Sequence, residues 1–197
     1  MSDYLKKGAT ISACGRYRYH LWREWRGFGR DDTWTWWTDS RGKKIVDGAG
    51  APIGDPKSVL FVMLNPSTAD GTADDPTIRR CVSFAKSWGY DRMEVVNLFA
   101  WRATEPRDLL AMTGDGDPIG PENKSAIQRT VSDAGLVVCA WGAHGGHIDQ
   151  DETVMGWIED ADGAPHALRL TKDGYPSHPL YLPAILTAVP YAGRRAS

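Results

Sequence analysis

The sequence predicts an α/β protein: a three-layer α/β/α sandwich with a mostly parallel central sheet, plus an N-terminal aromatic β-hairpin. Two observations predict the sandwich. Short continuous apolar runs, typical of strands buried on both faces, recur along the chain. Segments with helical periodicity alternate with them. A period-two pattern of aromatic residues near the N-terminus predicts the hairpin. No internal repeat or low-complexity linker interrupts the pattern, so residues 1–197 are expected to form one domain.

The hairpin is predicted from residues 16–39. In RYRYHLWREW (16–25), Tyr17, Tyr19 and Leu21 fall on one side of an extended chain and the polar residues and Trp22 on the other. The aromatic run TWTWWTD (33–39) is expected to be its antiparallel partner. Most of the tryptophans in this pair are expected to serve packing.

The rest of the chain supplies the sandwich. Strands are expected at 59–64, 93–101, 136–142 and 166–170. Helices are expected at 76–90, 106–112, 123–135 and 152–161, and a last helical segment at 183–189. Asp74 and Asp75 precede the first helix and Gly89 closes it, as start and stop signals do. The order is therefore hairpin, then β-α-β-α-β-α-β.

Composition excludes several classes of protein. Hydrophobic residues make up 42% and charged residues 24% of the chain, and no apolar run approaches the roughly 20 residues that span a bilayer. The N-terminus lacks the apolar core of a signal peptide, so a cytoplasmic monomer without membrane contact is expected. Three scattered cysteines, Cys14, Cys81 and Cys139, argue against a disulfide framework, an iron–sulfur cluster or a zinc knuckle.

Charge is unevenly distributed. Residues 1–44 hold ten Lys/Arg and five Asp/Glu, although the whole chain has a net charge of −2. This basic N-terminal third either faces phosphates or forms an ordinary solvated strand face.

The ends of the expected strands share a polar character. They read Asn65-Pro66-Ser67-Thr68, Asn97-Leu98-Phe99-Ala100, Trp141-Gly142-Ala143 and Ser177-His178-Pro179-Leu180. In an open α/β sheet, ligands bind beyond the carboxyl ends of the strands. Nucleophile elbows and phosphate-binding glycine loops are absent from the sequence. Two carboxamides and one imidazole suit recognition and polarisation of a neutral heterocycle, with no cofactor or metal.

Four motifs, LNPS, VVNLFAW, CAWG and HPLYL, occur in this order at those strand ends. In order and spacing, the chain resembles the uracil-DNA glycosylase superfamily over roughly residues 58–190. More narrowly, it resembles a bacterial and phage family known only as a domain of unknown function. The resemblance implies a uracil-DNA glycosylase-like fold and removal of a flipped-out base from DNA.

The resemblance also implies roles for individual residues. Asn65 matches the residue that orders the attacking water, and Asn97 the one that bonds the Watson–Crick edge of the base. His178 matches the imidazole beside the pyrimidine O2, and Leu182 a leucine inserted into the emptied base stack. Ser67 stands where the strictest uracil enzymes place a bulky ring, which leaves the choice of pyrimidine open.

Some positions depart from the superfamily. Asn65 is an amide and cannot act as a general base. Asp70, Asp74 or Asp75 could compensate, although capping explains the last two as well. No stacking aromatic transfers directly. Phe99 is taken as a base-binding candidate beside Phe84 and Trp101.

Other candidates have ordinary explanations beside functional ones. Asn65 before a proline is also a turn former. Arg79 and Arg80 open a helix, where they would bind phosphate or pair with Asp74 or Asp75. His144 is expected to contact the DNA backbone. A metal site of His144 and His147 with Asp149 or Asp151 is the less favoured alternative.

These observations predict a monofunctional DNA glycosylase that hydrolyses the N-glycosidic bond of uracil, or a related pyrimidine, in DNA and leaves an abasic site. Two alternatives stay open. One is an enzyme for a 5-substituted or hypermodified base. The other is a non-catalytic module that binds damaged or abasic DNA.

Overall fold

The computed structural model describes residues 4–25, 57–67, 71–103, 109 and 116–194. The expected strand at 33–39 lies outside these residues, as does Asp70. The expected helix at 106–112 is described only at Leu109, which is fully buried.

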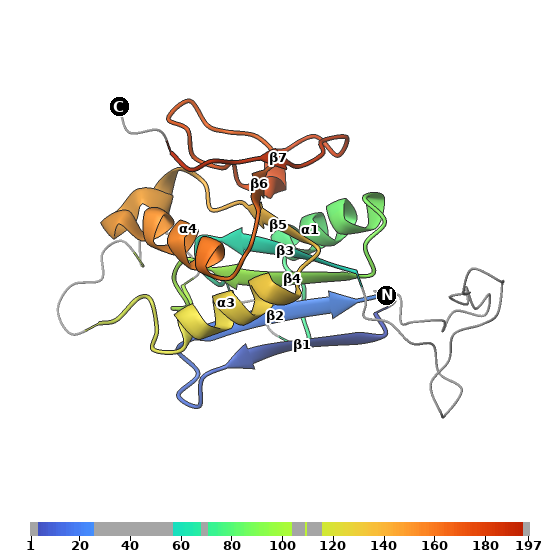
Figure 1. Ribbon diagram of the computed structural model, residues 1–197. Coiled ribbons are helices and arrows are strands. Elements are labelled where there is room, and N and C mark those ends of the chain that lie inside the picture. Colours follow the sequence, from blue (N-terminus) through green and yellow to red (C-terminus); the bar gives the residue numbers. More distant parts are fainter. Residues whose placement is uncertain (1–3, 26–56, 68–70, 104–108, 110–115, 195–197) are drawn as a thin grey trace.

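The described residues form an α/β structure with one mixed sheet of seven strands (Figure 1). Its order is β1-β2-β4-β3-β5-β6-β7. The four central strands β4, β3, β5 and β6 are parallel, whereas β1, β2 and β7 are antiparallel to their neighbours. The expectation of a mostly parallel sheet is therefore correct only for its centre. The bounds are β1 (Lys6–Ile11), β2 (Arg18–Glu24), β3 (Ser58–Met63), β4 (Arg92–Asn97), β5 (Leu136–Cys139), β6 (Pro165–Ala167) and β7 (Val189–Pro190).

Helices cover both faces of this sheet (Figure 1). Helix α1 (Pro76–Ser87) lies on one face, and α3 (Asn123–Asp133) and α4 (Gln150–Asp160) lie on the other. Asp75 caps α1, because its Oδ1 accepts the main-chain N–H of Ile78 at 2.7 Å. In the part of the chain that the structure describes, no helix combines the length and apolar character needed to cross a bilayer.

The side chains on the two faces of the central strands pack into two separate hydrophobic cores. Side chains alternate along a strand, so Phe61 of β3 faces α1 while Leu60 and Val62 face α3 and α4. All three are fully buried. Burial on both faces explains why β3 reads as a continuous apolar run.

At the edges of the sheet, the structure differs from the expectation in two places. Strand β2 pairs with β1 on one side and β4 on the other, and β1 is absent from the sequence-based expectation. The segment KKGATI has exposed charges and no apolar alternation, as suits an edge strand. The expected helix at 183–189 does not form. Val189 precedes a proline, which favours extended backbone, and Val189–Pro190 pairs with β6 as β7.

The register of β2 contains an irregularity. Thr10 pairs with His20 but Ile11 pairs with Arg18, so one residue of β2 is skipped. Such a bulge breaks the alternation of side chains. As a result, Arg18 lines a cavity beside α1, whereas His20 lines a cavity beside α3. The regular alternation expected for residues 16–25 therefore fails at this point.

Candidate active site

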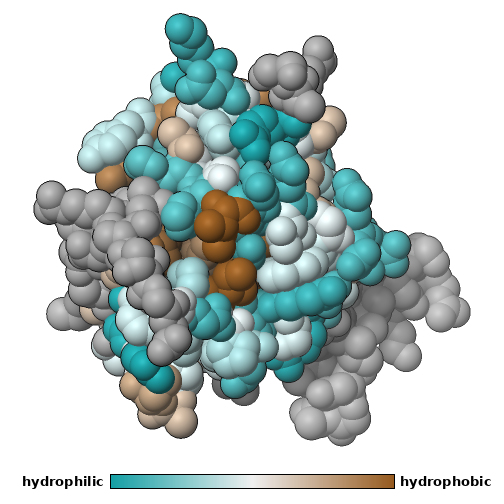
Figure 2. Space-filling model, turned by 90° about the vertical axis from the view of Figure 1, so that its left-hand side faces the viewer, coloured by the Kyte–Doolittle hydropathy of each residue, from teal (hydrophilic) through white to brown (hydrophobic). Residues whose placement is uncertain are grey.

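A cavity of about 650 Å³ lies at the carboxyl ends of the parallel strands. From β3 the chain passes to β4 on one side of the sheet, and from β4 it crosses to β5 on the other. The end of β3 is therefore a topological switch point, where open α/β sheets bind ligands. Figure 2 views this end of the molecule and shows a small apolar area framed by hydrophilic side chains. The cavity is lined by residues that follow β3, β4 and β5, by the start of α1, by Arg18 of β2, and by His178, Leu180 and Tyr181.

Asn97, the last residue of β4, is the most informative residue of this cavity. Its side chain lines the cavity, yet the residue is only 1% exposed. Neither Nδ2 nor Oδ1 has a hydrogen-bond partner among the described residues. Leaving a buried amide unpaired costs about 1–3 kcal/mol. An uncompensated donor and acceptor at this position therefore point to a ligand that supplies the missing partners.

His178 reaches the same cavity from a loop after β6. Its Nδ1 accepts the main-chain N–H of Leu180 at 3.4 Å, which leaves the proton of a neutral ring on Nε2. Burial lowers the pKa of the imidazole, and the Asp75 carboxylate opposes this shift without cancelling it. Gly142 lies next to the Cβ of His178 and has a φ of +76°, a backbone conformation in which any side chain at 142 would be strained. The site therefore presents a neutral imidazole with a donor at Nε2.

Asn65 follows β3 and is fixed by its main-chain neighbours. Its Nδ2 donates to the carbonyl oxygens of Ala103 at 2.9 Å and Pro66 at 3.2 Å. These bonds use the N–H donors of the amide, so Oδ1 is left as an acceptor at the cavity. Two residues on, the Ser67 hydroxyl donates to Oδ2 of Asp75. This bond joins the turn after β3 to the start of α1.

The structure thus brings together Asn65, Ser67, Asn97 and His178, which the sequence placed at separate strand ends. It adds two residues to which the sequence reasoning gave no role of their own. Arg18 is 2% exposed and lines the cavity because of the bulge in β2. The sequence pattern does not predict this bulge. Trp141 is buried beside Tyr191, and its Nε1 has no partner among the described residues. The sequence signal that could have identified Trp141 is its position at the end of an apolar run.

One residue predicted at the rim lies in the core. Leu182 is only 7% exposed and packs in the core beneath α1, so it does not extend from the surface. Its neighbour Tyr181 is 89% exposed and lines the cavity. The short 3₁₀ helix Pro179–Tyr181 turns the chain so that Leu182 points inward.

The remaining predicted residues are divided between the rim and the core. His144 is exposed at the cavity rim, and Arg79 is exposed on α1, where it donates to the carbonyl of Asp74. Arg80 donates instead to the carbonyl of Leu182 and lies over the Phe84 ring. Phe99 is fully buried, packs near His147 and does not line the cavity. The side chains of Arg80 and Phe99 therefore make contacts within the protein that stabilise the fold.

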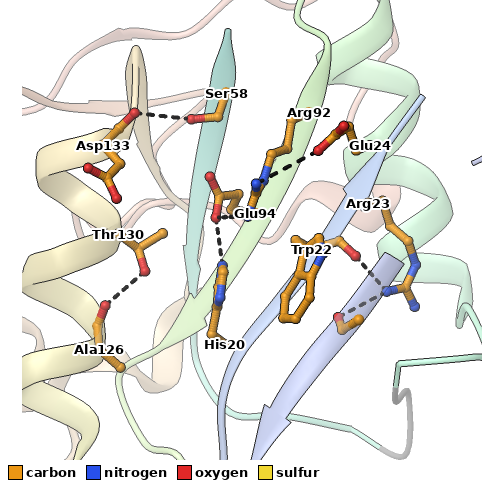
Figure 3. Close-up of polar contacts among 11 residues, drawn as sticks. His20, Trp22, Arg23, Glu24, Ser58, Arg92, Glu94, Ala126, Thr130 and Asp133 are labelled. Atoms are coloured by element: carbon orange, nitrogen blue, oxygen red, sulfur yellow. Dashed lines mark hydrogen bonds and ion pairs between the residues drawn. The ribbon is translucent and has the colours of Figure 1, made fainter. Parts of the chain in front are cut away.

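A second cavity, of about 760 Å³, lies beside α3, and several charged side chains line it. Figure 3 shows its network: His20 bonds Glu94 at 2.7 Å, Arg92 bonds Glu94 at 3.1 Å, and Thr130 donates to the carbonyl of Ala126. Burial raises the pKa of Glu94, but the contacts with His20 and Arg92 outweigh it and hold that pKa below its usual value. The buried Glu94 carboxylate is thus satisfied by the protein itself, unlike the Asn97 amide.

The metal alternative finds no support in the geometry. Among the residues that the structure describes, no three His, Cys, Asp or Glu side chains gather closely enough to bind a metal ion. His144 and His147 lie in the segment Ala143–Asp149, where His144 is exposed and His147 packs near Phe99.

Comparison with known proteins gives a family. The family described as "Protein of unknown function (DUF1643)" matches residues 51–180. The chain belongs to this family. No curated protein and no solved structure matches it. Membership of the DUF1643 family assigns no activity and gives no link to the uracil-DNA glycosylase superfamily, so that resemblance stays a prediction. The matched segment contains Asn65, Asn97 and His178, whereas Arg18 precedes it.

Proposed function

We propose that this protein is a DNA glycosylase that removes uracil, or a related pyrimidine, from a nucleotide flipped out of DNA. The unpartnered amide of Asn97 in the cavity at the strand ends is the observation that carries the proposal. An enzyme that acts on a base must take it out of the stack and satisfy its hydrogen-bonding edge. The amide of Asn97 offers both a donor and an acceptor for that edge.

Asn97 would bond N3–H and O4 of uracil through Oδ1 and Nδ2. Cytosine reverses the polarity of these positions and would need the amide turned over. The buried Trp141, whose indole N–H has no partner among the described residues, also lines this cavity. These groups suit a planar, neutral heterocycle with several polar edge atoms.

His178 would stabilise the departing base. Breaking the glycosidic bond leaves negative charge on the pyrimidine, and a fixed donor at O2 lowers the barrier. Removing a comparable donor costs about 3–4 kcal/mol in other enzymes. The Nε2–H of a neutral His178 provides such a donor, and the Oδ1 of Asn65 would orient the attacking water.

The rim suits a DNA strand. His144 is exposed at the cavity, and Arg79 is exposed on α1, whose residues Thr77 and Ile78 line it. Arg16 is exposed with its guanidinium over the Trp101 ring at 5.7 Å. Exposed basic and polar side chains of this kind contact phosphates in protein–DNA complexes. Tyr181, exposed at the cavity, takes the place that the sequence assigned to Leu182 as the side chain that fills the emptied stack.

Incubation with a uracil-containing oligonucleotide, followed by alkaline cleavage, tests the proposal. Strand cleavage at the uracil is expected for the wild type, and less than a hundredth of that rate for Asn97→Ala and His178→Ala. Leu182→Ala serves as a control for destabilisation. Cleavage by both cavity variants at the wild-type rate would remove the assignment.

A 5-substituted pyrimidine is the second candidate substrate. The side chain at position 67 is a serine tied to Asp75, not a bulky ring that would exclude a 5-substituent. Parallel assays on uracil and 5-substituted oligonucleotides separate the two substrates. A third possibility is binding of abasic DNA without catalysis, which an inert protein that still retards abasic duplexes in a gel would support.

A further inference from the structure

The proposed hydrolysis needs a proton acceptor, and Asn65 cannot serve. A carboxamide orients water through its oxygen but takes no proton at neutral pH. The attacking water must lose a proton as its oxygen bonds to the sugar, and a positioned base accelerates such a step by about 10²–10⁴-fold. The cavity should therefore contain a carboxylate or an imidazole that is free for this role.

Among the described residues that line the cavity, Asp75 alone carries a carboxylate. It is the residue before α1, and the bond from Ser67 holds its Oδ2 against the turn that contains Asn65. Its Oδ1 accepts the N–H of Ile78. An ionised carboxylate has about four acceptor positions, so these two bonds orient the group and leave lone pairs for a water.

We propose that Asp75 is the general base, accepting a proton from the water that Asn65 orients. This inference rests on the proposed glycosylase function. The water oxygen bonds to C1′ as the C1′–N1 bond breaks, and the electron pair of that bond leaves on the base. One water proton passes to Asp75 and then to solvent. The base anion, held by His178, takes a proton from solvent when it is released.

The other ionisable groups of the cavity suit this role less well. His178 is half-buried, and its donor Nε2–H is used on the departing base. Arg18 is a cation without acceptor capacity, and His144 is exposed at the rim. Asp75 and His178 both line the cavity, and the carboxylate of Asp75 raises the pKa of His178 against the effect of burial.

Substitution by another capping residue separates catalysis from helix capping. Asn and Ser cap helices about as well as Asp, so Asp75→Asn and Asp75→Ser should unfold within a few degrees of the wild type. Asp133→Asn is the matched control, since its side chain lies at the second cavity. Single-turnover excision and binding to a duplex with a stable abasic analogue are measured for all four proteins.

We expect both Asp75 variants to excise uracil at least 100-fold more slowly, to bind the abasic duplex as the wild type does, and to lose the acidic limb of the pH–rate profile. Asp133→Asn should match the wild type. Asp75 variants within about threefold of the wild-type rate would overturn the role of Asp75 and leave the glycosylase proposal standing. A wild type without excision of any pyrimidine would overturn both.

Discussion

Asn123 donates the two hydrogens of its amide to the main-chain carbonyls of Asn97 and Leu98, each at 3.0 Å. Gln150 donates to the same Leu98 carbonyl at 3.1 Å. Asn123 and Gln150 begin α3 and α4 and are buried. Two helices on one face of the sheet therefore fix the backbone at the end of β4, while the Asn97 side chain stays unpartnered in the cavity.

Asn123→Ala should destabilise the protein and impair excision together. The substitution removes the Asn123 donor from the Asn97 carbonyl and leaves the Leu98 carbonyl with Gln150 alone, at a cost of about 1–3 kcal/mol. Urea denaturation measures the loss of stability, and single-turnover assays measure the rate. An unchanged stability would contradict the positioning of Asn97 by α3.

Asn97→Leu should separate stability from activity. Leucine has a similar shape and removes an unpaired buried amide, so the free energy of unfolding is expected to stay equal or rise by about 1 kcal/mol. Excision should be lost because nothing reads the base edge. Thermal unfolding and the uracil assay test both parts, and a large fall in stability would mean that the amide is satisfied within the protein.

Tyr181→Ala and Leu182→Ala form a matched pair on neighbouring residues. Truncation of the exposed Tyr181 should cost little stability but should weaken binding to uracil-containing duplex DNA. The buried Leu182 should cost about 2–5 kcal/mol of stability. Denaturation and fluorescence anisotropy distinguish the two. The opposite assignment of effects would restore Leu182 as the inserted residue.

The lowered pKa of His178 predicts a pH dependence of stability. The unfolded chain binds a proton near its ordinary pKa of 6.5, whereas the folded chain resists protonation to lower pH. The stability is therefore full above pH 6.5 and falls as the pH drops from there toward the folded pKa. His178→Gln should remove this part of the decline in melting temperature between about pH 7 and about pH 5. If the melting temperatures of the wild type and of His178→Gln fell equally over this pH range, the pKa of His178 would not be lowered in the folded protein.

Glu94→Gln should affect stability and spare excision. The side chain of Glu94 is 7% exposed and paired with His20 and Arg92, so losing its charge should cost about 1–3 kcal/mol. Because the folded pKa of Glu94 lies below its ordinary 4.5, this contribution is present above that pH and fades as the pH falls below it. Loss of excision at wild-type stability would point to the second cavity as the active site.

The sequence predicted much of the central fold. The expected strand at 59–64 appears at Ser58–Met63, and the expected helix at 76–90 appears as Pro76–Ser87. These elements carry strong local signals: a continuous apolar run, and apolar spacing with a cap. The edges were less predictable, because β1 and β7 exist through pairing with neighbours and have little pattern of their own.

The site was predictable in part for a similar reason. Asn65 and Asn97 end apolar strands, so topology alone brings them together. Arg18 required a bulge, and the exchange of Tyr181 for Leu182 required a tight turn, which local sequence does not specify. Asp75 reads equally well as a helix cap, and only the shared cavity gives it a second role.

The skipped residue in β2 lets two separate stretches of the chain build one chamber. The floor comes from the segment shared with the DUF1643 family, and one wall comes from a strand outside that match. A substitution at residue 18 is therefore expected to alter which substituents the chamber admits while Asn65, Asn97 and His178 stay as they are. Engineering a different ligand range into this protein would therefore start from β2.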